Sequence, residues 1–348
     1  MQSHRSALTK RWKHEILLAH VKERSVPSAF EVPVYNITRF ANLGFENLAV
    51  RPNGQILTTT TNPNASVYQV DPLNILPPTL VHTIPNVTSA NGILEREPDV
   101  YYIASGYINL TSPFDTVPSS YSITELDMRG VLVLPNGRLS RPPVTKRIAS
   151  LPNAALMNGI ALARPQSDHL LVADTFRGLI WNVNVQTGSI DIALNDTTTK
   201  GSTSNPAGIN GMKVHNGSLY WTNTGQSKLY KVAIDEKGNV PYGCKPEVVT
   251  ANIVCDDLVL DHRGIAYVAS PSGLITKVSP GGQQEVIAGN STGSKLNGPT
   301  AVRFCRLASD RWSLYITTDG GIPQFGGPVN GTQGVSRIDL SASDQRRY

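Results

Sequence analysis

The chain has 348 residues, of which 40% are hydrophobic and 16% charged, and its 31 basic and 26 acidic side chains give a net charge of +5. This composition combines ample apolar surface with little charge, which excludes an intrinsically disordered chain. It also argues against a nucleic-acid partner, because the basic residues are scattered rather than gathered into a stripe. A membrane span is not expected, because no apolar run reaches the roughly 18 residues of a spanning helix.

Residues 1–38 are expected to form an N-terminal arm that is only partly ordered. The arm holds the one dense basic cluster, Lys10 to His14, and its apolar run from Ile16 to Ala19 is too short for the core of a signal peptide. The localisation therefore stays open, since eight glycosylation sequons would also suit the secretory pathway. These sequons lie at Asn36, Asn64, Asn86, Asn109, Asn195, Asn216, Asn290 and Asn330.

One pattern recurs six times after the arm. It consists of a polar residue, most often in Asn-Gly, followed by an apolar alternation, a turn and a second strand-like run. The six occurrences are F-E-N-L-A-V from Phe45, A-N-G-I-L from Ala90, M-N-G-I-A-L from Met157, I-N-G-M-K-V from Ile209, C-D-D-L-V-L from Cys255 and L-N-G-P-T-A-V from Leu296.

Short strands with turns between them, and no sustained helical period, indicate an all-β fold. The 251 residues from Glu46 to Asn297 span five intervals of about 50 residues each, which suits a four-stranded propeller blade. The sequence therefore predicts a single six-bladed β-propeller over residues 39–348, with antiparallel blades around a central channel. The interval from Asn91 to Asn158 is 67 residues long, so we expect an insertion in blade two at about residues 106–150.

The first strand of each propeller blade lines the central channel. The polar residue that opens each repeat therefore predicts a ring of six oxygen-bearing side chains at one mouth. Asn-Gly and Asp-Asp are also turn sequences, and turn chemistry alone would account for three or four of the six. The ring residues are Glu46, Asn91, Asn158, Asn210, Asp256 and Asn297.

The loops that follow the second strands should overhang this ring. The blade-two insertion carries Tyr107 and Phe114, and the glycine-rich loop of blade six carries Asp319 and Phe325. Aromatic walls over a polar floor are typical of a site for a mostly apolar small molecule. Alternatively, the aromatic residues only anchor exposed loops. The predicted substrate-binding set is Asn91, Tyr107, Phe114, Phe176, Asn223, Asn297, Asp319 and Phe325.

Other chemical signals are sparse. The three cysteines, Cys244, Cys255 and Cys305, cannot all pair, and three buried free thiols or a single Cys244–Cys255 bridge would both fit. The chain has no nucleophile elbow, P-loop or dinucleotide fingerprint, which argues against serine hydrolases and nucleotide hydrolases. The sequence does not define an oligomeric state.

Three of the ring motifs resemble those of a known group. Glu46 in F-E-N-L-A-V, Asn158 in M-N-G-I-A and Asp256 in C-D-D-L-V-L are similar to the senescence-marker-protein, gluconolactonase and strictosidine-synthase-like superfamily of six-bladed propellers. In its lactonase branch, residues at these three positions hold a divalent cation. The resemblance thus implies a metal site at Glu46, Asn158 and Asp256, for which oxygen ligands favour calcium before magnesium, manganese or zinc.

The two sequence motifs F-E-N-L-A-V-R-P-N-G and C-D-D-L most resemble those of a fungal branch of this superfamily whose members act in natural-product pathways. That branch includes cyclases that add a polyketide-derived quinone methide to a terpene alkene by a hetero-Diels–Alder reaction. The resemblance implies such a cyclase without a cofactor, with Asp256, Asn158 and Asn210 as catalytic residues. The alternatives are a metal-dependent lactonase and a binding propeller without chemistry. Asp257 departs from the lactonase pattern, which has glycine there, and adds a second charge beside the site.

Overall fold

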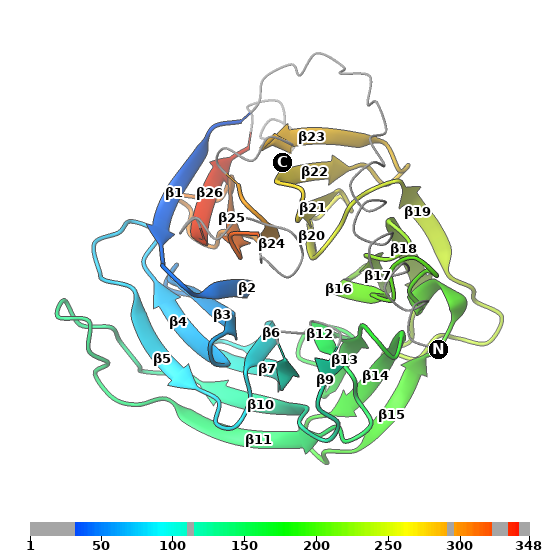
Figure 1. The fold of residues 1–348 in the computed structure, drawn as a ribbon, viewed down its shortest axis with the longest axis horizontal. Coiled ribbons are helices and arrows are strands. Elements are labelled where there is room, and N and C mark those ends of the chain that lie inside the picture. The colour runs from blue at the N-terminus through cyan, green and yellow to red at the C-terminus, as the bar shows by residue number, and fades with distance from the viewer. Residues whose placement is uncertain (1–31, 110–114, 291–295, 322–332, 341–348) are drawn as a thin grey trace, which may run out of the picture. The chain divides into compact units, whose positions relative to one another are not determined.

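The computed structural model describes residues 32–109, 115–290, 296–321 and 333–340. Within these ranges the regular structure consists of 26 strands and one short 3-10 helix, Thr197–Thr199. Six four-stranded antiparallel sheets surround a common axis, which confirms the predicted six-bladed β-propeller (Figure 1). All six sheets lie in the compact unit of residues 31–348, and the other unit, residues 1–30, lies outside the described residues.

Each sheet is one blade, with its first strand at the axis. Blades one to three, from the axis outward, are β2 (Gly44–Val50), β3 (Ile56–Asn62), β4 (Ser66–Val70) and β5 (Thr79–Thr83); β6 (Ser89–Glu97), β7 (Val100–Gly106), β10 (Ser122–Asp127) and β11 (Val144–Ser150); and β12 (Met157–Leu162), β13 (His169–Asp174), β14 (Leu179–Asn184) and β15 (Ile190–Leu194). Blades four to six are β16 (Ile209–His215), β17 (Ser218–Asn223), β18 (Lys228–Ala233) and β19 (Glu247–Ala251); β20 (Leu258–Leu260), β21 (Ala266–Ser270), β22 (Leu274–Val278) and β23 (Gln284–Ala288); and β24 (Pro299–Phe304), β25 (Ser313–Thr318), β26 (Gly334–Asp339) and β1 (Val34–Arg39).

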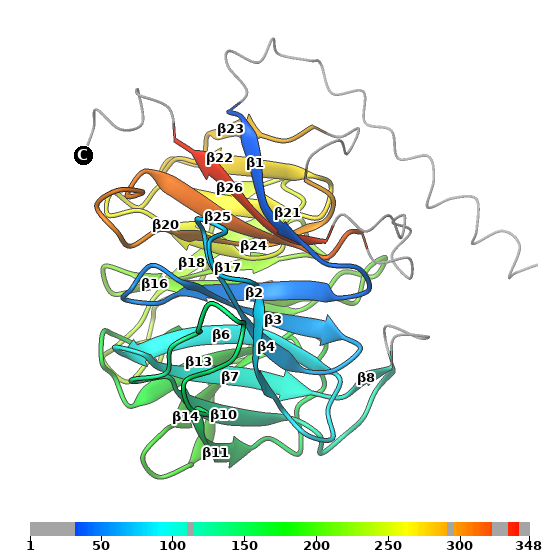
Figure 2. The ribbon, with the colours of Figure 1, turned by 90° about the vertical axis from the view of Figure 1, so that its left-hand side faces the viewer.

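Blade six is built from both ends of the described chain. Its outer strand is β1, which pairs antiparallel with β26 so that Val34 lies opposite Ile338. The two strands run side by side in Figure 2. The last residues of the expected N-terminal arm thus supply a strand, and hydrogen bonds between β1 and β26 close the ring of blades.

Two extra segments interrupt blade two. The first, between β7 and β10, contains the small pair β8 (Ile108–Asn109) and β9 (Asp115–Thr116). The second, between β10 and β11, folds back on itself through a bridge between Val133 and Leu139. Despite both segments, β10 and β11 keep the regular strand order of the blade.

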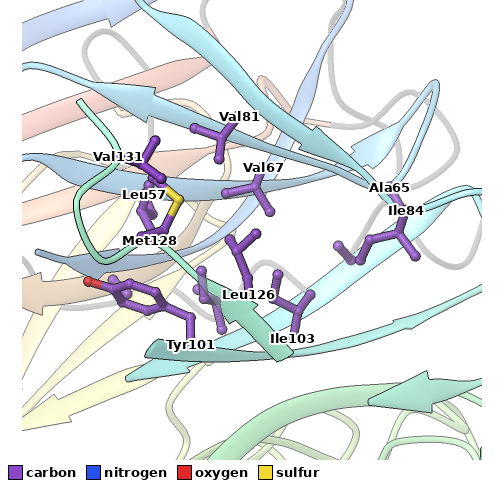
Figure 3. Close-up of a cluster of buried hydrophobic side chains, with 13 residues drawn as sticks. Leu57, Ala65, Val67, Val81, Ile84, Tyr101, Ile103, Leu126, Met128 and Val131 are labelled. Carbon is purple, nitrogen blue, oxygen red and sulfur yellow. The ribbon is translucent and has the colours of Figure 1, made fainter. Parts of the chain in front are cut away.

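Among the residues that the structure describes, the hydrophobic core is divided into six clusters, one between each pair of adjacent blades. In the first, Leu57 and Val67 of blade one pack against Ile103 and Leu126 of blade two (Figure 3). This arrangement explains the apolar runs in the sequence, because both faces of a central strand touch a neighbouring blade. Burial of these faces positions the six first strands around the axis.

All three cysteines are free, as one of the two readings of the sequence predicts. Cys255 and Cys305 are buried, but Cys244 is exposed, which corrects the expectation that all three thiols would be buried. Among the described residues, no helix is long and apolar enough to cross a membrane.

Candidate functional site

The six predicted ring residues occupy equivalent places in the propeller. Glu46, Asn91, Asn158 and Asn210 lie near the beginnings of β2, β6, β12 and β16. Asp256 and Asn297 each come two residues before the first strand of their blade, β20 and β24. Every first strand contacts the first strand of the next blade, so the ring is continuous around the axis.

The glycine that follows the ring asparagine has a packing role in three blades. Gly92, Gly159 and Gly211 lie inside strands, so the turn interpretation of Asn-Gly is wrong at these positions. A Cβ on Gly159 would come within 2.5 Å of the Asn210 carbonyl oxygen, and one on Gly92 would meet the Asn158 carbonyl oxygen. Glycine is therefore needed because the first strands approach each other too closely for any side chain.

The ring residues sit in irregular backbone. The pairing of β2, β6, β12 and β16 with the second strand shifts register at or beside the ring residue. Such bulges re-aim side chains and occur next to active sites. At these register shifts, backbone carbonyls are left out of the hydrogen-bond ladder between the strands. Buried threonines donate hydrogen bonds to such carbonyls instead.

These threonines connect one blade to the next. Thr175 donates to the Ile209 carbonyl at 2.7 Å, and Thr300 donates to the Phe45 carbonyl at 3.0 Å. Thr222 donates to the carbonyl of Asp256 itself. The backbone that carries the ring is therefore fixed by side chains of the neighbouring blade.

Two ring carboxyls lie in an unfavourable electrostatic environment. Burial raises the pKa of Glu46 well above its ordinary value, and the nearby charges of Asp256, Asp319 and Asp257 raise it further. Burial also raises the pKa of Asp256, as do the charges of Asp257 and Asp319. Like charges in a poorly solvated place resist joint ionisation, so this pair retains a proton at a pH where isolated carboxyls are fully ionised.

Asp257, by contrast, is neutralised by neighbouring cations. Its carboxylate accepts from Arg303 at 2.8 Å and from Lys213 at 3.2 Å, and Asn47 also donates to it, at 3.1 Å. Burial alone raises the pKa of Asp257, but the two cations outweigh burial and lower it below its ordinary value. The extra charge expected beside the site is therefore balanced within the protein.

Sequence reasoning missed the two cations of this network. Lys213 lies in β16 and Arg303 in β24, and each belongs to the first strand of its blade. Burial and the charge of Arg303 lower the pKa of Lys213 to about 8, against the opposing effect of Asp257. The available signal was a basic residue within an otherwise largely apolar run, in G-M-K-V and A-V-R-F.

The four ring amides differ in their hydrogen bonding. Asn91 donates to the Met157 carbonyl at 2.9 Å and accepts from Ser89, and Asn297 donates to the Gly320 carbonyl at 2.8 Å. Asn210 donates to Thr224 at 3.0 Å and also hydrogen-bonds Asp256, while its buried Oδ1 has no partner. Asn158 is 7% exposed, and its amide makes no hydrogen bond within the described structure.

The remaining predicted residues are placed differently. Asn223 is fully buried and uses its amide on the backbone of Thr198, Lys200 and Gln226. Tyr107 is 39% exposed just after β7, and Phe176 is half-buried in the loop after β13. The candidates that lie outside the described residues are Phe114, Phe325 and the sequon residue Asn330. Of the other seven sequon asparagines, Asn109 is half-buried and the rest are exposed.

The candidate metal ligands fit a hard cation by their chemistry. Glu46, Asn158 and Asp256 offer only oxygen ligands, and two of them are carboxyls for which no ion pair is seen within the described structure. In the described residues, however, no three His, Cys, Asp or Glu side chains are placed to hold a metal ion. Any cation here would therefore depend on amide or backbone oxygens for part of its coordination.

Two curated fungal proteins are similar to this chain along most of its length. The chain is 29% identical over 302 residues to a proposed hetero-Diels-Alderase from Phoma sp, which covers 78% of this chain and 82% of that protein. It is 26% identical over 306 residues to a second proposed hetero-Diels-Alderase, from Sarocladium schorii, which covers 78% of this chain and 74% of that protein. No family model matches the chain.

Solved structures share its fold. A calcium-binding regucalcin from Agrobacterium tumefaciens superposes with a TM-score of 0.58 at 16% identity, covering 90% of this chain and 96% of that one. A proposed gluconolactonase superposes with a TM-score of 0.56 at 12% identity, and the match covers 88% of this chain and 92% of that one. Identities this low show the fold alone. Together the comparisons confirm the resemblance to the gluconolactonase-like propellers and to their fungal branch.

Proposed function

We propose that this protein is a cyclase that catalyses a hetero-Diels–Alder addition between a polyketide-derived quinone methide and a terpene alkene. The observation that supports it most is the similarity to two proposed hetero-Diels-Alderases over 78% of the chain.

The reaction suits a site without an activated nucleophile. The four-atom heterodiene of the quinone methide, which ends in its carbonyl oxygen, meets the two alkene carbons. One C–C and one C–O bond form while three π bonds become one, and no atom leaves. The protein has to align two apolar partners and exclude water, which would otherwise add to the quinone methide.

Asn158 is the ring amide best placed to assist the heterodiene. Its side chain is almost fully buried and makes no hydrogen bond within the described structure, whereas Asn91, Asn210 and Asn297 each donate at least one N–H group to the protein. A hydrogen bond from Asn158 Nδ2 to the carbonyl oxygen would stabilise the negative charge that develops there. Asn210 and Asp256 would orient the polar end of the substrate. Tyr107, Phe114, Phe176 and Phe325 would provide apolar walls.

The test is product formation from a quinone methide generated in the assay, in the presence of an alkene. We expect the protein to raise the cycloaddition rate and to give one stereoisomer in excess. Asn158→Leu should lower kcat by about 10- to 1,000-fold while the protein stays folded. The matched control is Asn136→Leu, at an exposed position in the loop between β10 and β11. A racemic product at the uncatalysed rate with wild-type protein would refute the proposal.

A metal-dependent lactonase is the second candidate, favoured by the two buried carboxyls at Glu46 and Asp256. A bound divalent cation would polarise a lactone carbonyl and acidify a water molecule. Calcium titration of wild-type protein and Asp256→Ala separates the candidates. A tightly bound ion that is lost in the variant, together with lactone hydrolysis, would favour the lactonase over the cyclase.

A further inference from the structure

The ring of six side chains has an uneven balance of hydrogen-bond donors and acceptors. An amide offers two N–H groups and a carbonyl, whereas an ionised carboxylate only accepts. Buried polar groups are nearly always paired, so the capacity that the protein leaves unused indicates what a ligand must supply. The inference below rests on the proposed function, and it concerns the chemistry of the substrate at the same site.

Most donors near the ring are used within the protein. The amides of Asn91 and Asn297 donate to backbone carbonyls, at 2.9 and 2.8 Å. The amide of Asn210 donates to Thr224 at 3.0 Å and hydrogen-bonds Asp256. The two cations of the channel, Lys213 and Arg303, both contact Asp257.

The acceptors, by contrast, are left over. No ion pair to Glu46 or Asp256 is seen among the described residues, since the nearby cations are held by Asp257. Even when one proton is shared between the two carboxyls, their four oxygens hold many more lone pairs than protons. Asn210 is 8% exposed, and its Oδ1 has no partner, which is a second and independent unsatisfied acceptor next to Asp256.

A ring amide that makes no hydrogen bond within the described structure lies across the axis. Glu46 belongs to blade one and Asp256 to blade five, the two neighbours of blade six. Asn158 belongs to blade three, which is opposite blade six in a ring of six. Its amide makes no hydrogen bond within the described structure and can donate to a carbonyl. The polar floor therefore has an acceptor side and, facing it, one side that can donate.

We propose that the ring binds the head of a ligand that carries two neighbouring hydroxyl groups on an aromatic or enolic ring. The hydroxyls donate to Glu46 and Asp256, with Asn210 Oδ1 as a third acceptor, and a carbonyl on the far side of the head accepts from Asn158. The substrate class is thus a hydroxylated quinone methide or its phenolic precursor, rather than a fully alkylated one.

Binding of three small phenol derivatives tests this assignment without turnover. The probes are catechol with two hydroxyls, 2-methoxyphenol with one, and 1,2-dimethoxybenzene with none, which share a ring and differ in donors. Dissociation constants are measured by ligand-observed NMR under argon, with a chelator present because catechol also binds metal ions. We expect catechol to bind at least tenfold more tightly than 1,2-dimethoxybenzene, with 2-methoxyphenol between them.

A variant series locates the effect. Asp256→Leu should reduce the preference for catechol to less than threefold, whereas Asp191→Leu, at an exposed position in β15, should leave it unchanged. If Asp256→Leu fails to fold, the wild-type series still decides the matter. Equal binding of the three probes, or binding that requires added calcium, would overturn the inference.

The outcome is distinguishable from that of the proposed function. A clear donor preference without any cycloaddition would support the ligand class and count against the cyclase. Stereoselective cycloaddition without a donor preference would support the cyclase and overturn this inference.

Discussion

Replacement of Asp257 by asparagine is the sharpest test of the electrostatics in the channel. The change keeps the shape of the side chain and removes its charge. Its carboxylate is 3% exposed, and its partners Arg303 and Lys213 are 14% and 16% exposed, so all three groups are poorly solvated. Asp257→Asn leaves two neighbouring cations buried without a counter-charge.

The expected cost is large for a single substitution. Breaking a buried ion pair by removal of one partner typically costs about 3–5 kcal/mol, because the other charge stays desolvated. In a chain of this size that corresponds to a fall in Tm of about 4–8 °C. The assay is thermal and urea unfolding at pH 7, compared with Asp127→Asn. Asp127 pairs with Arg129, which is 61% exposed, so that control should cost about 1 kcal/mol or less.

The pH dependence supplies a second check on Asp257. The pKa of Asp257 is lower in the folded protein than in the unfolded chain. Its contribution to stability is therefore complete above its pKa in the unfolded chain and is lost as the pH falls through its pKa in the folded protein. The difference in stability between wild type and Asp257→Asn should therefore narrow in acid, and it should also narrow above about pH 8, where Lys213 loses its charge. A loss below about 1 kcal/mol at pH 7, or a gap that does not change with pH, would refute the reasoning.

Three further predictions concern the ring and its surroundings. The pKa of Glu46 is raised in the folded protein, so the stability of the wild type should fall as the pH rises above the pKa of this residue in the unfolded chain. Glu46→Gln should reduce this fall, as measured by Tm from pH 5 to 8 with a chelator present. Lys213 has a lowered pKa of about 8, so wild-type protein should gain stability from about pH 8 towards pH 10, and Lys213→Met should remove that gain in urea unfolding. Gly159→Ala should lower the free energy of unfolding by about 1–3 kcal/mol, because the new Cβ meets the Asn210 carbonyl. Gly281→Ala should be nearly neutral, because its Cβ would meet only Ser279 Oγ, at an ordinary contact distance of 3.9 Å. Equal Tm values for these two variants would contradict the packing argument.

The fold was accessible from the sequence because it is repetitive. Six copies of one pattern, spaced by about 50 residues, fix the number of blades, and each copy marks its first strand with a polar residue. Glu46, Asn158 and Asn210 were found in this way, since a strand that begins at the channel carries its opening residue there. The role of β1 was not predicted, because its partner β26 lies some 300 residues away.

The sequence by itself determined the six blades and the ring of oxygen-bearing residues. Only the tertiary structure decided which of these groups are available to a ligand. Asn223 was predicted to bind substrate, as Asn91 and Asn297 were, yet its amide makes its hydrogen bonds to backbone groups of the neighbouring loops. Asp257 stood in the sequence as an added charge, and the structure pairs it with Arg303 and Lys213 from two other blades. Local pattern specifies a strand and its facing side chains, but charge balance and hydrogen-bond satisfaction depend on residues that only the closed ring brings together.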